Sequence, residues 1–421
     1  MHWEIALRWM SGTLGEVNWE NALVEAQSGV AALAGEPDSP EKALVETGFA
    51  FPLLYCRLEV DRAFEQARTG LAIAERLKDA NQVAFANTIL ALGSVWRGDL
   101  NRAQDYAERS YKAGDRSTDP WVRAIGLTFP AYAWPWLNDR EWPERWLSRY
   151  REFRQHTHVP RLDRSAHTVG ALLAALSGHP VEAEAELRRD DELAAPNRVQ
   201  HGMHGHKAAT ALAVLGHHDA ADLRFRQTFD LNDASGGRLF VVETARSYAR
   251  FLLDCGDFTR AESILDRGYA LAHARGVLVA ELHLAALRGE LYARTGRHDA
   301  ADACLLRTRE ILVLPQAWRG LAAAVHRAGG VIATARGNCT EAEDCFARAV
   351  DAERAYGFLY YEAQHLATWA ELYSQRDEPG DRERGLEKLD QASTIFERCA
   401  ATRDLERVRR RRAAPAGWSS S

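Results

Sequence analysis

A short phrase that begins with glycine and ends with alanine recurs along this chain at intervals of about 40 residues. It reads Gly-Asp-Leu-Asn-Arg-Ala from Gly98 to Ala103 and Gly-Asp-Phe-Thr-Arg-Ala from Gly256 to Ala261. Aligned on the last residue, with steps of 38 to 43, the copies end at Ala22, Ala63, Ala103, Pro143, Ala183, Ala221, Ala261, Ala301, Ala342 and Gly385. Such a period is typical of stacked repeat proteins. Ten units therefore cover nearly all of the 421 residues.

Each unit is predicted to contain two helices joined by a short turn. The glycine ends the first helix, because the left-handed conformation that caps a helix is least costly for glycine. The aligned alanine falls where the second helix crosses the first, and a larger side chain would push the two axes apart. Apolar residues recur at helical spacings, and no window alternates with a period of two. The sequence therefore predicts an all-α protein.

In one unit, several residues match the characteristic positions of a known repeat at the same spacing. Leu287-Arg288-Gly289-Glu290-Leu291-Tyr292, followed by Gly296 and Ala301, resembles the tetratricopeptide pattern of Leu, Gly and Tyr, then Gly, then Ala. The resemblance implies a right-handed α-solenoid of about ten tetratricopeptide-like helix-turn-helix repeats. The units are longer than the usual 34 residues. Longer units of this kind resemble the sensor region of bacterial ATP-dependent LuxR-type regulators and the C-terminal region of ATPase-linked adenylate cyclases, whose closing helices are similar to residues 392–408.

The repeat also predicts the domain organisation. We expect one solenoid over residues 1–412, with units turning near residues 18, 58, 98, 138, 178, 216, 256, 296, 337 and 380, and a flexible tail over residues 413–421. The arginine run 409–412 is expected to be a fraying helix end. The first helix is expected to begin at about His2, with no cap residue before it. Two alternatives stay open: a fragment of a longer polypeptide with a covalently linked ATPase or cyclase domain, or a true start at Met1.

Composition and motifs exclude several classes of function. The 46% hydrophobic content argues against disorder, and the net charge of −6 argues against direct nucleic-acid binding. The longest largely apolar stretch, Gly126–Leu137, is too short to span a membrane. None of the five lysines follows a glycine, so a phosphate-binding loop is absent. The six cysteines form no Cys-x-x-Cys pair, which is typical of buried thiols in a reducing cytoplasm. We therefore expect a cytoplasmic, non-enzymatic protein without a cofactor or catalytic residues.

The tetratricopeptide resemblance implies that a partner binds in the concave groove lined by the first helix of each unit. Carrying the pattern over unit by unit gives the candidate groove residues Phe85, Trp96, Tyr132, Trp136, His206, Glu243, Arg246, Arg250, His283, Glu290 and Arg294. Aromatic and arginine side chains are the residues that dominate binding energies at protein interfaces. The alternative is that these residues are solvated or pack between helices.

Three local clusters have both a functional and a structural interpretation. Residues 121–146 hold five tryptophans and three prolines, which predict a kinked helix that opens a pocket for a flat or apolar ligand, or tryptophans that fill the gaps of the kink. Five histidines lie within residues 201–218, and surface histidines are favoured over a metal site. The arginine run 407–412 could contact phosphate, but a solvated helix end is favoured.

Two functions remain as hypotheses. The first is a non-catalytic protein–protein interaction scaffold or regulatory arm that binds a partner segment in its concave groove, in bacterial signal transduction or transcription control. The alternative is a small-molecule sensor domain with a pocket in the solenoid groove. The ten-unit repeat without a catalytic motif motivates both hypotheses.

Overall fold

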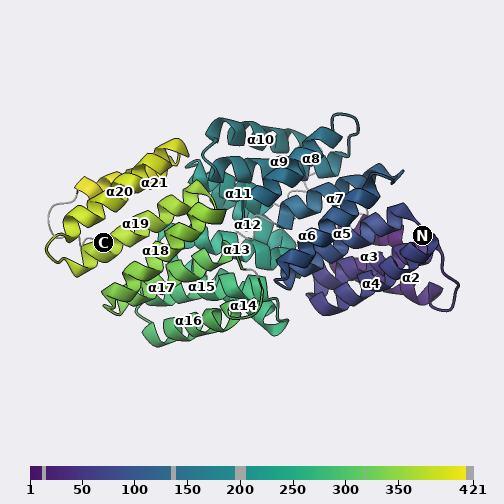
Figure 1. The fold of residues 1–421 in the computed structure, drawn as a ribbon, viewed down its shortest axis with the longest axis horizontal. Coiled ribbons are helices and arrows are strands. Elements are labelled where there is room, and N and C mark those ends of the chain that lie inside the picture. Colours follow the sequence, from purple (N-terminus) through teal and green to yellow (C-terminus); the bar gives the residue numbers. More distant parts are fainter. Residues whose placement is uncertain (12–15, 134–138, 195–204, 317, 414–421) are drawn as a thin grey trace.

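The computed structural model describes residues 1–11, 16–133, 139–194, 205–316 and 318–413, which form 21 helices and no strand. Consecutive helices pack as antiparallel pairs (Figure 1), and α21 (Thr402–Ala413) follows the last pair. The first helices of the pairs are α1 (His2–Ser11), α3 (Pro40–Arg57), α5 (Ala80–Trp96), α7 (Pro120–Ala133), α9 (Pro160–Leu176), α11 (Gly205–Val214), α13 (Arg238–Cys255), α15 (Leu278–Arg294), α17 (Leu321–Ala335) and α19 (Leu359–Arg376). The second helices are α2 (Trp19–Leu33), α4 (Val60–Leu77), α6 (Leu100–Gly114), α8 (Glu141–Phe153), α10 (Pro180–Ala194), α12 (His218–Ala234), α14 (Phe258–Ala274), α16 (His298–Leu312), α18 (Cys339–Tyr356) and α20 (Asp381–Arg398). The predicted all-α solenoid is confirmed.

The turns inside the pairs follow from the repeated phrase. Gly98 and Gly256 have φ values of 78° and 79°, a left-handed conformation that an L side chain rarely adopts. The aspartate that follows each glycine caps the next helix, because the side chains of Asp99 and Asp257 accept a hydrogen bond from a backbone N–H of the first turn. The aligned Ala261 is fully buried. The glycine, the aspartate and the alanine therefore end one helix, start the next and let the two cross closely.

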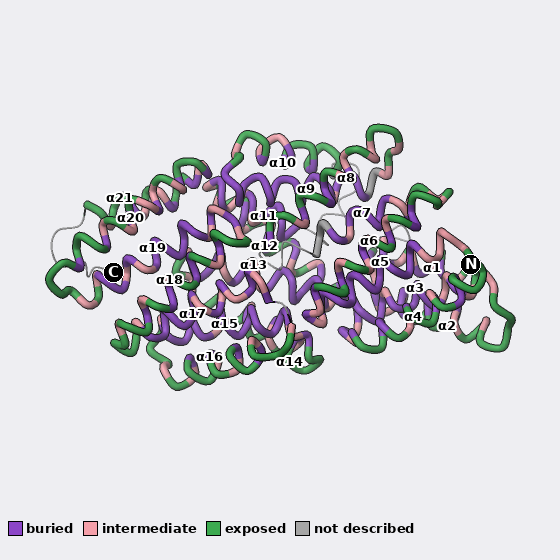
Figure 2. The backbone as a smooth tube through the Cα atoms, in the orientation of Figure 1, coloured by how far each residue is buried: buried purple, intermediate pink, exposed green. Residues whose placement is uncertain are grey.

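From α3 onwards the first helices bury more than half of their described residues, whereas α1 and the second helices bury one stripe. In α15, 14 of 17 residues are buried, including His283 and Glu290. In its partner α16 only four of 15 are buried. Figure 2 shows this contrast between the inner helices and the outer ones. A helix that is buried all round must be covered by more than its sequence neighbours, so segments distant in the chain have to close over the first helices.

Those covering contacts join segments about five units apart. The backbone N–H of Trp19 donates to Ser235 O (3.0 Å), and the N–H of Arg140 donates to Tyr356 O (2.8 Å). The guanidinium of Arg319 forms an ion pair with Asp139 (2.5 Å), 180 residues away in the chain. The solenoid is thus wound tightly enough for its successive turns to touch.

Replacing a glycine between two helices with alanine should test this contact between successive turns of the superhelix. A Cβ on Gly98 would lie 2.9 Å from the ring of Trp318, whereas a Cβ on Gly296, with a similar φ of 74°, would meet nothing within 4 Å. Both substitutions impose the same left-handed backbone strain of about 1–2 kcal/mol. We expect Gly98→Ala to lower the free energy of unfolding by a further ~1–2 kcal/mol, because it overpacks the contact. Urea unfolding of the two variants measures the difference, and equal losses would contradict the contact.

The proline-rich segment is described only in part. Pro130 lies inside α7, and Pro143 is the third residue of α8. Residues 134–138, which include Trp134, Pro135 and Trp136, lie outside the described residues. The expected kink therefore stays a prediction.

The helix composition and the cysteines bear on the classes of protein that the sequence analysis excluded. Over the described residues, no helix combines the length and apolar character needed to cross a membrane. All six cysteines are free thiols, but only Cys56, Cys345 and Cys399 are buried, and Cys255 is exposed, so the expectation of buried thiols holds for half of them. Burial raises the pKa of the Cys56 thiol to about 12, which makes this thiol inert at neutral pH.

Candidate functional site

The inner faces of six consecutive first helices surround a cavity of about 120 Å³, which we call the groove cavity. Most of its walls come from α9, α11, α13, α15, α17 and α19, while α12 adds His218 and Phe225, α18 adds Glu353, and α21 adds Asp404 and Arg407. Helices of units five to ten therefore converge on one cavity, as expected for the concave side of a solenoid. Its lining mixes apolar side chains, among them leucines from α9 and α15, with charged and hydrogen-bonding ones.

A carboxylate with three arginine partners lies beside the groove cavity. Glu290 is 1% exposed and lies 2.6 Å from Arg250 Nη2, 3.2 Å from Arg327 Nη2 and 3.2 Å from Arg294 Nε. Burial alone would raise the pKa of Glu290, but Arg250, Arg327 and Arg294 outweigh burial and hold that pKa well below its usual value of 4.5. The charge of Glu290 thus ties α13, α15 and α17 together.

A second carboxylate extends these contacts to the last helices. Asp254 lies 3.4 Å from Arg327 Nη2, and its Oδ2 accepts a hydrogen bond from Gln364 Nε2 (2.9 Å). Arg407 of α21 donates to the backbone oxygen of Asp254 (2.9 Å) and pairs with Asp404 (2.5 Å). The C-terminal helix is therefore docked against α13, some 150 residues earlier in the chain.

The α11 side of the groove cavity holds a cation, a carboxylate and a histidine in a buried setting. Burial raises the pKa of Glu243 to about 7, against the opposing effect of Lys207 and Arg246. Burial also lowers the pKa of Lys207, whose Nζ lies 3.2 Å from His206 Nε2. The pKa of His283 falls well below 6.5, through burial and then through Arg246. This side can exchange a proton near neutral pH at Glu243, while His283 stays uncharged.

A histidine and a carboxylate lie on the α19 side of the groove cavity. Glu353 Oε1 lies 3.4 Å from His365 Nε2, and its Oε2 accepts a hydrogen bond from the backbone N–H of Phe358 (3.2 Å). Burial, followed by Arg327 and Arg250, holds the pKa of His365 well below 6.5. His365 is thus a neutral hydrogen-bonding group in the groove wall.

The structure brings together part of the predicted groove set. Four of the eleven residues line the groove cavity: His206, Arg246, Arg250 and His283. Glu290 and Arg294 lie in the adjoining ion-pair network, and Glu243 is buried on α13.

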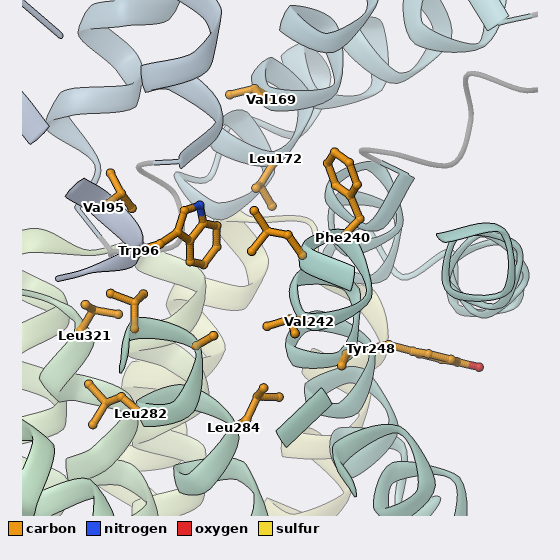
Figure 3. Packing of buried hydrophobic residues seen from close by; sticks show 14 of the residues in the cluster. Val95, Trp96, Val169, Leu172, Phe240, Val242, Tyr248, Leu282, Leu284 and Leu321 are labelled. Carbon is orange, nitrogen blue, oxygen red and sulfur yellow. The ribbon is translucent and has the colours of Figure 1, made fainter. Parts of the chain in front are cut away.

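The other predicted residues lie elsewhere. Trp96 is 1% exposed and is drawn among Val95, Leu172, Leu282 and Leu321 in Figure 3, so it is a core residue and does not line the groove cavity. Phe85 lines a separate cavity described below. The side chain of Tyr132, and Trp136 altogether, lie outside the described residues. Trp96 shows why some of the predicted groove positions are wrong. A repeat pattern applied to each unit separately contains no information on contacts with a unit five repeats away.

Sequence reasoning missed the groove residues of the last helices, among them Arg327, Gln364, His365, Asp404 and Arg407. Arg327 precedes its aligned alanine by 15 residues, as Arg246 precedes its own, so the pattern could have found it. Asp404 and Arg407 belong to a helix outside the repeat, and no local signal places them.

The structure also bears on the histidine cluster and the arginine run that the sequence analysis singled out. His201 and His204 lie outside the described residues, and His217 pairs with Glu184 (2.8 Å). Within the part of the chain that the structure describes, no three potential ligands gather as a metal site would require.

The arginine run is not a fraying end, because α21 continues to Ala413 and Arg411 pairs with Glu371 (2.6 Å). The sequence missed this because the carboxylate belongs to another unit.

No protein-family model matches the chain, and no curated protein matches it. Several solved structures are similar in fold, and two of them follow here. A Rap protein complexed with competence and sporulation factor has a TM-score of 0.58 and 12% identity, covering 87% of this chain and 99% of that one. The Cut9 and Hcn1 hetero-tetramer of the APC/C gives 0.52 and 12%, covering 99% of this chain and 78% of that one. At these identities the likeness shows the fold, which is that of a tetratricopeptide-like α-solenoid.

Proposed function

We propose that this chain is a non-catalytic scaffold that binds an extended protein segment in its groove cavity. The observation that carries the proposal is the convergence of six inner helix faces on one cavity that mixes leucines with charged and amide side chains. An extended segment presents alternating side chains and a row of backbone donors and acceptors, and a wall of this mixed character matches both.

The groove cavity measures about 120 Å³. That volume accommodates one or two anchoring side chains. The rest of a bound segment would lie along the inner helix faces.

Electrostatics indicates an acidic anchor beside Arg246. Burial lowers the pKa of Arg246 to about 10, because the opposing effects of Tyr361 and Glu353 do not compensate for it. Arg246 lines the groove cavity together with Leu172 and Leu287. A carboxylate of a bound segment that reached Arg246 would form a charge-assisted hydrogen bond. We therefore infer a segment with one acidic residue flanked by apolar ones.

A solved protein of the same fold supports the proposal by precedent. The Rap protein was solved in complex with competence and sporulation factor, and nearly its whole length aligns with this chain. A solenoid of this size can therefore hold a partner. We further propose that the chain is a regulatory arm in bacterial signal transduction or transcription control, with a linked ATPase or cyclase domain, on the resemblance of residues 392–408 to the closing helices of such regions.

Selection from a displayed random peptide library tests the proposal. Wild-type protein should enrich peptides that bind at micromolar concentration and share an acidic residue next to apolar ones. Arg246→Ala should weaken the selected peptides by about 30-fold, the effect of losing one interface anchor worth ~2 kcal/mol. Fluorescence anisotropy of a labelled peptide measures the change.

The matched control is Arg226→Ala, which removes an exposed arginine from the outer helix α12, where it pairs with Asp222. This control should bind the peptides as wild type does. A library without any micromolar binder, or peptides that bind Arg246→Ala as well as wild type, would count against the groove as the binding site.

A further inference from the structure

A second cavity, of about 80 Å³, lies at the other end of the helices that wall the groove cavity. On α9, α11 and α13 it is lined by Leu162, Gly205 and Phe240, near the N-terminal ends of those helices. The groove cavity uses residues further along the same three helices. We call the second cavity the aromatic pocket, because eight rings line it: Trp3, Trp19, Phe51, Tyr55, Phe85, Trp121, Phe129 and Phe240.

The rings form two packed walls. In one wall, Tyr55 stacks against Trp19, with ring centroids 5.3 Å apart, and lies 4.7 Å from Phe240. In the other, Phe85 lies 5.9 Å from Trp3 and 5.6 Å from Trp121. Rings at these separations support one another. Phe51 also packs on Phe129, with ring centroids 5.5 Å apart. Because the rings pack against one another, they hold one another in place around the cavity.

The space is too large to be a packing defect. A single water molecule needs about 10–15 Å³, and this cavity is several times larger. Protein interiors hold few voids larger than a water molecule. Most of the lining consists of rings and aliphatic side chains, which a flat apolar molecule would contact.

A buried ion pair supplies the polar end of the aromatic pocket. Arg164 Nε lies 2.9 Å from Asp190 Oδ1, and these side chains are 8% and 1% exposed. The Thr168 hydroxyl lies 3.1 Å from the same carboxylate oxygen, and Ser165 completes this end. Asp190 also lies 3.4 Å from Arg224 Nη1, and Arg224 pairs in turn with Asp191 (2.5 Å). The two arginines and two aspartates neutralise one another, so a charged ligand would enter an apolar cavity without a counter-charge, which is strongly unfavourable. A neutral hydroxyl or amide can hydrogen-bond here instead.

We propose that the aromatic pocket binds a small neutral molecule with one aromatic ring and one hydroxyl or amide group. The ring lies between the two aromatic walls, and its polar group reaches the Arg164, Ser165, Thr168 and Asp190 end. This site is separate from the groove cavity proposed for a protein segment, and either proposal can fail without the other.

Binding of p-cresol, a neutral phenol, tests this proposal against two charged rings of similar size, benzoate and benzylammonium. We expect p-cresol to bind saturably with one site per chain in calorimetry, and to change the tryptophan emission. Benzoate and benzylammonium should bind at least about tenfold more weakly, because each brings an uncompensated charge. No saturable p-cresol binding, or equal affinity for a charged ring, would overturn the proposal.

Two matched variants assign the site. Ile125→Phe places a larger side chain in the aromatic pocket and should weaken p-cresol binding at least about tenfold, whereas Leu287→Phe fills the groove cavity and should leave it unchanged. Circular dichroism checks that both fold. If Ile125→Phe misfolds, Leu7→Phe serves instead, since it also places a larger side chain in the aromatic pocket and should weaken p-cresol binding likewise. Loss of binding in Leu287→Phe, or full binding in a folded Ile125→Phe, would contradict the assignment.

Discussion

Replacing Glu290 with alanine is expected to lower the free energy of unfolding by about 3–5 kcal/mol, the usual effect of removing one partner from a buried ion pair. Glu290 is 1% exposed and is contacted by Arg250, Arg294 and Arg327. Without its carboxylate, three guanidinium groups would face one another across the inner helices. Small globular proteins are stable by only about 5–15 kcal/mol, so the variant should unfold at a markedly lower urea concentration.

The control for this prediction is Glu262→Ala. Glu262 is more than a third exposed, and its partner Arg297 is similarly exposed. Exposed ion pairs contribute about 0–1 kcal/mol, so this variant should unfold close to wild type. Urea denaturation followed by circular dichroism gives both values. If the two variants lose similar amounts, Glu290 does not hold the inner helices together.

Acid should destabilise the protein below pH 6.5 through two buried histidines. The pKa values of His283 and His365 in the folded protein lie well below 6.5, chiefly because of burial. Below pH 6.5 the unfolded chain therefore binds protons that the folded chain does not, and stability falls as pH falls. Each histidine contributes a loss of about 1.4 kcal/mol per pH unit until its folded pKa is reached. His283→Gln should roughly halve the contribution of this pair.

Glu243 should act with the opposite sign. Burial raises its folded pKa to about 7, above the ordinary 4.5. Between pH 4.5 and 7 the folded chain binds the extra proton, so this group favours the folded state as pH falls through that window. Glu243→Gln should therefore make the free energy of unfolding fall more steeply as pH falls, whereas His283→Gln should make it fall less steeply. The free energy of unfolding at several pH values between 7 and 5 measures both slopes, and slopes equal to wild type would refute the assignment of these groups.

The helix pairs could be predicted from the sequence because their signals are local. Gly98 and Ala103 lie five residues apart, and a left-handed turn followed by a close helix crossing depends only on the residues around it. The same local register placed His206, Arg246, Arg250 and His283 on the inner faces, where they line one cavity.

The failures share one physical cause. Trp96 was predicted on the groove, but it is buried beside residues of α9, α15 and α17 (Figure 3). Asp404 and Arg407 carried no predicted role, yet both line the groove cavity. In each case the decisive neighbour comes from another part of the superhelix, and no spacing within a unit encodes it.

The aromatic pocket shows the same limit. Phe85 was predicted for the groove, and residues 121–146 were singled out for a pocket, but the cavity also needs Trp3, Trp19 and Phe240. The ring of Phe240 lies 5.7 Å from that of Trp19, more than 200 residues away in the chain. Two walls from distant units create a binding space that neither unit holds alone.

The sequence by itself therefore determined the helices, their pairing and the stacking of ten units, because glycine caps, small crossing residues and helical spacing act within about 40 residues. Only the tertiary structure decided how tightly the solenoid winds. That winding brings residues 19 and 235, 140 and 356, and 139 and 319 into contact. The pitch of a superhelix is the sum of many small rotations between neighbouring units, so the cavities it encloses are a property of the whole chain.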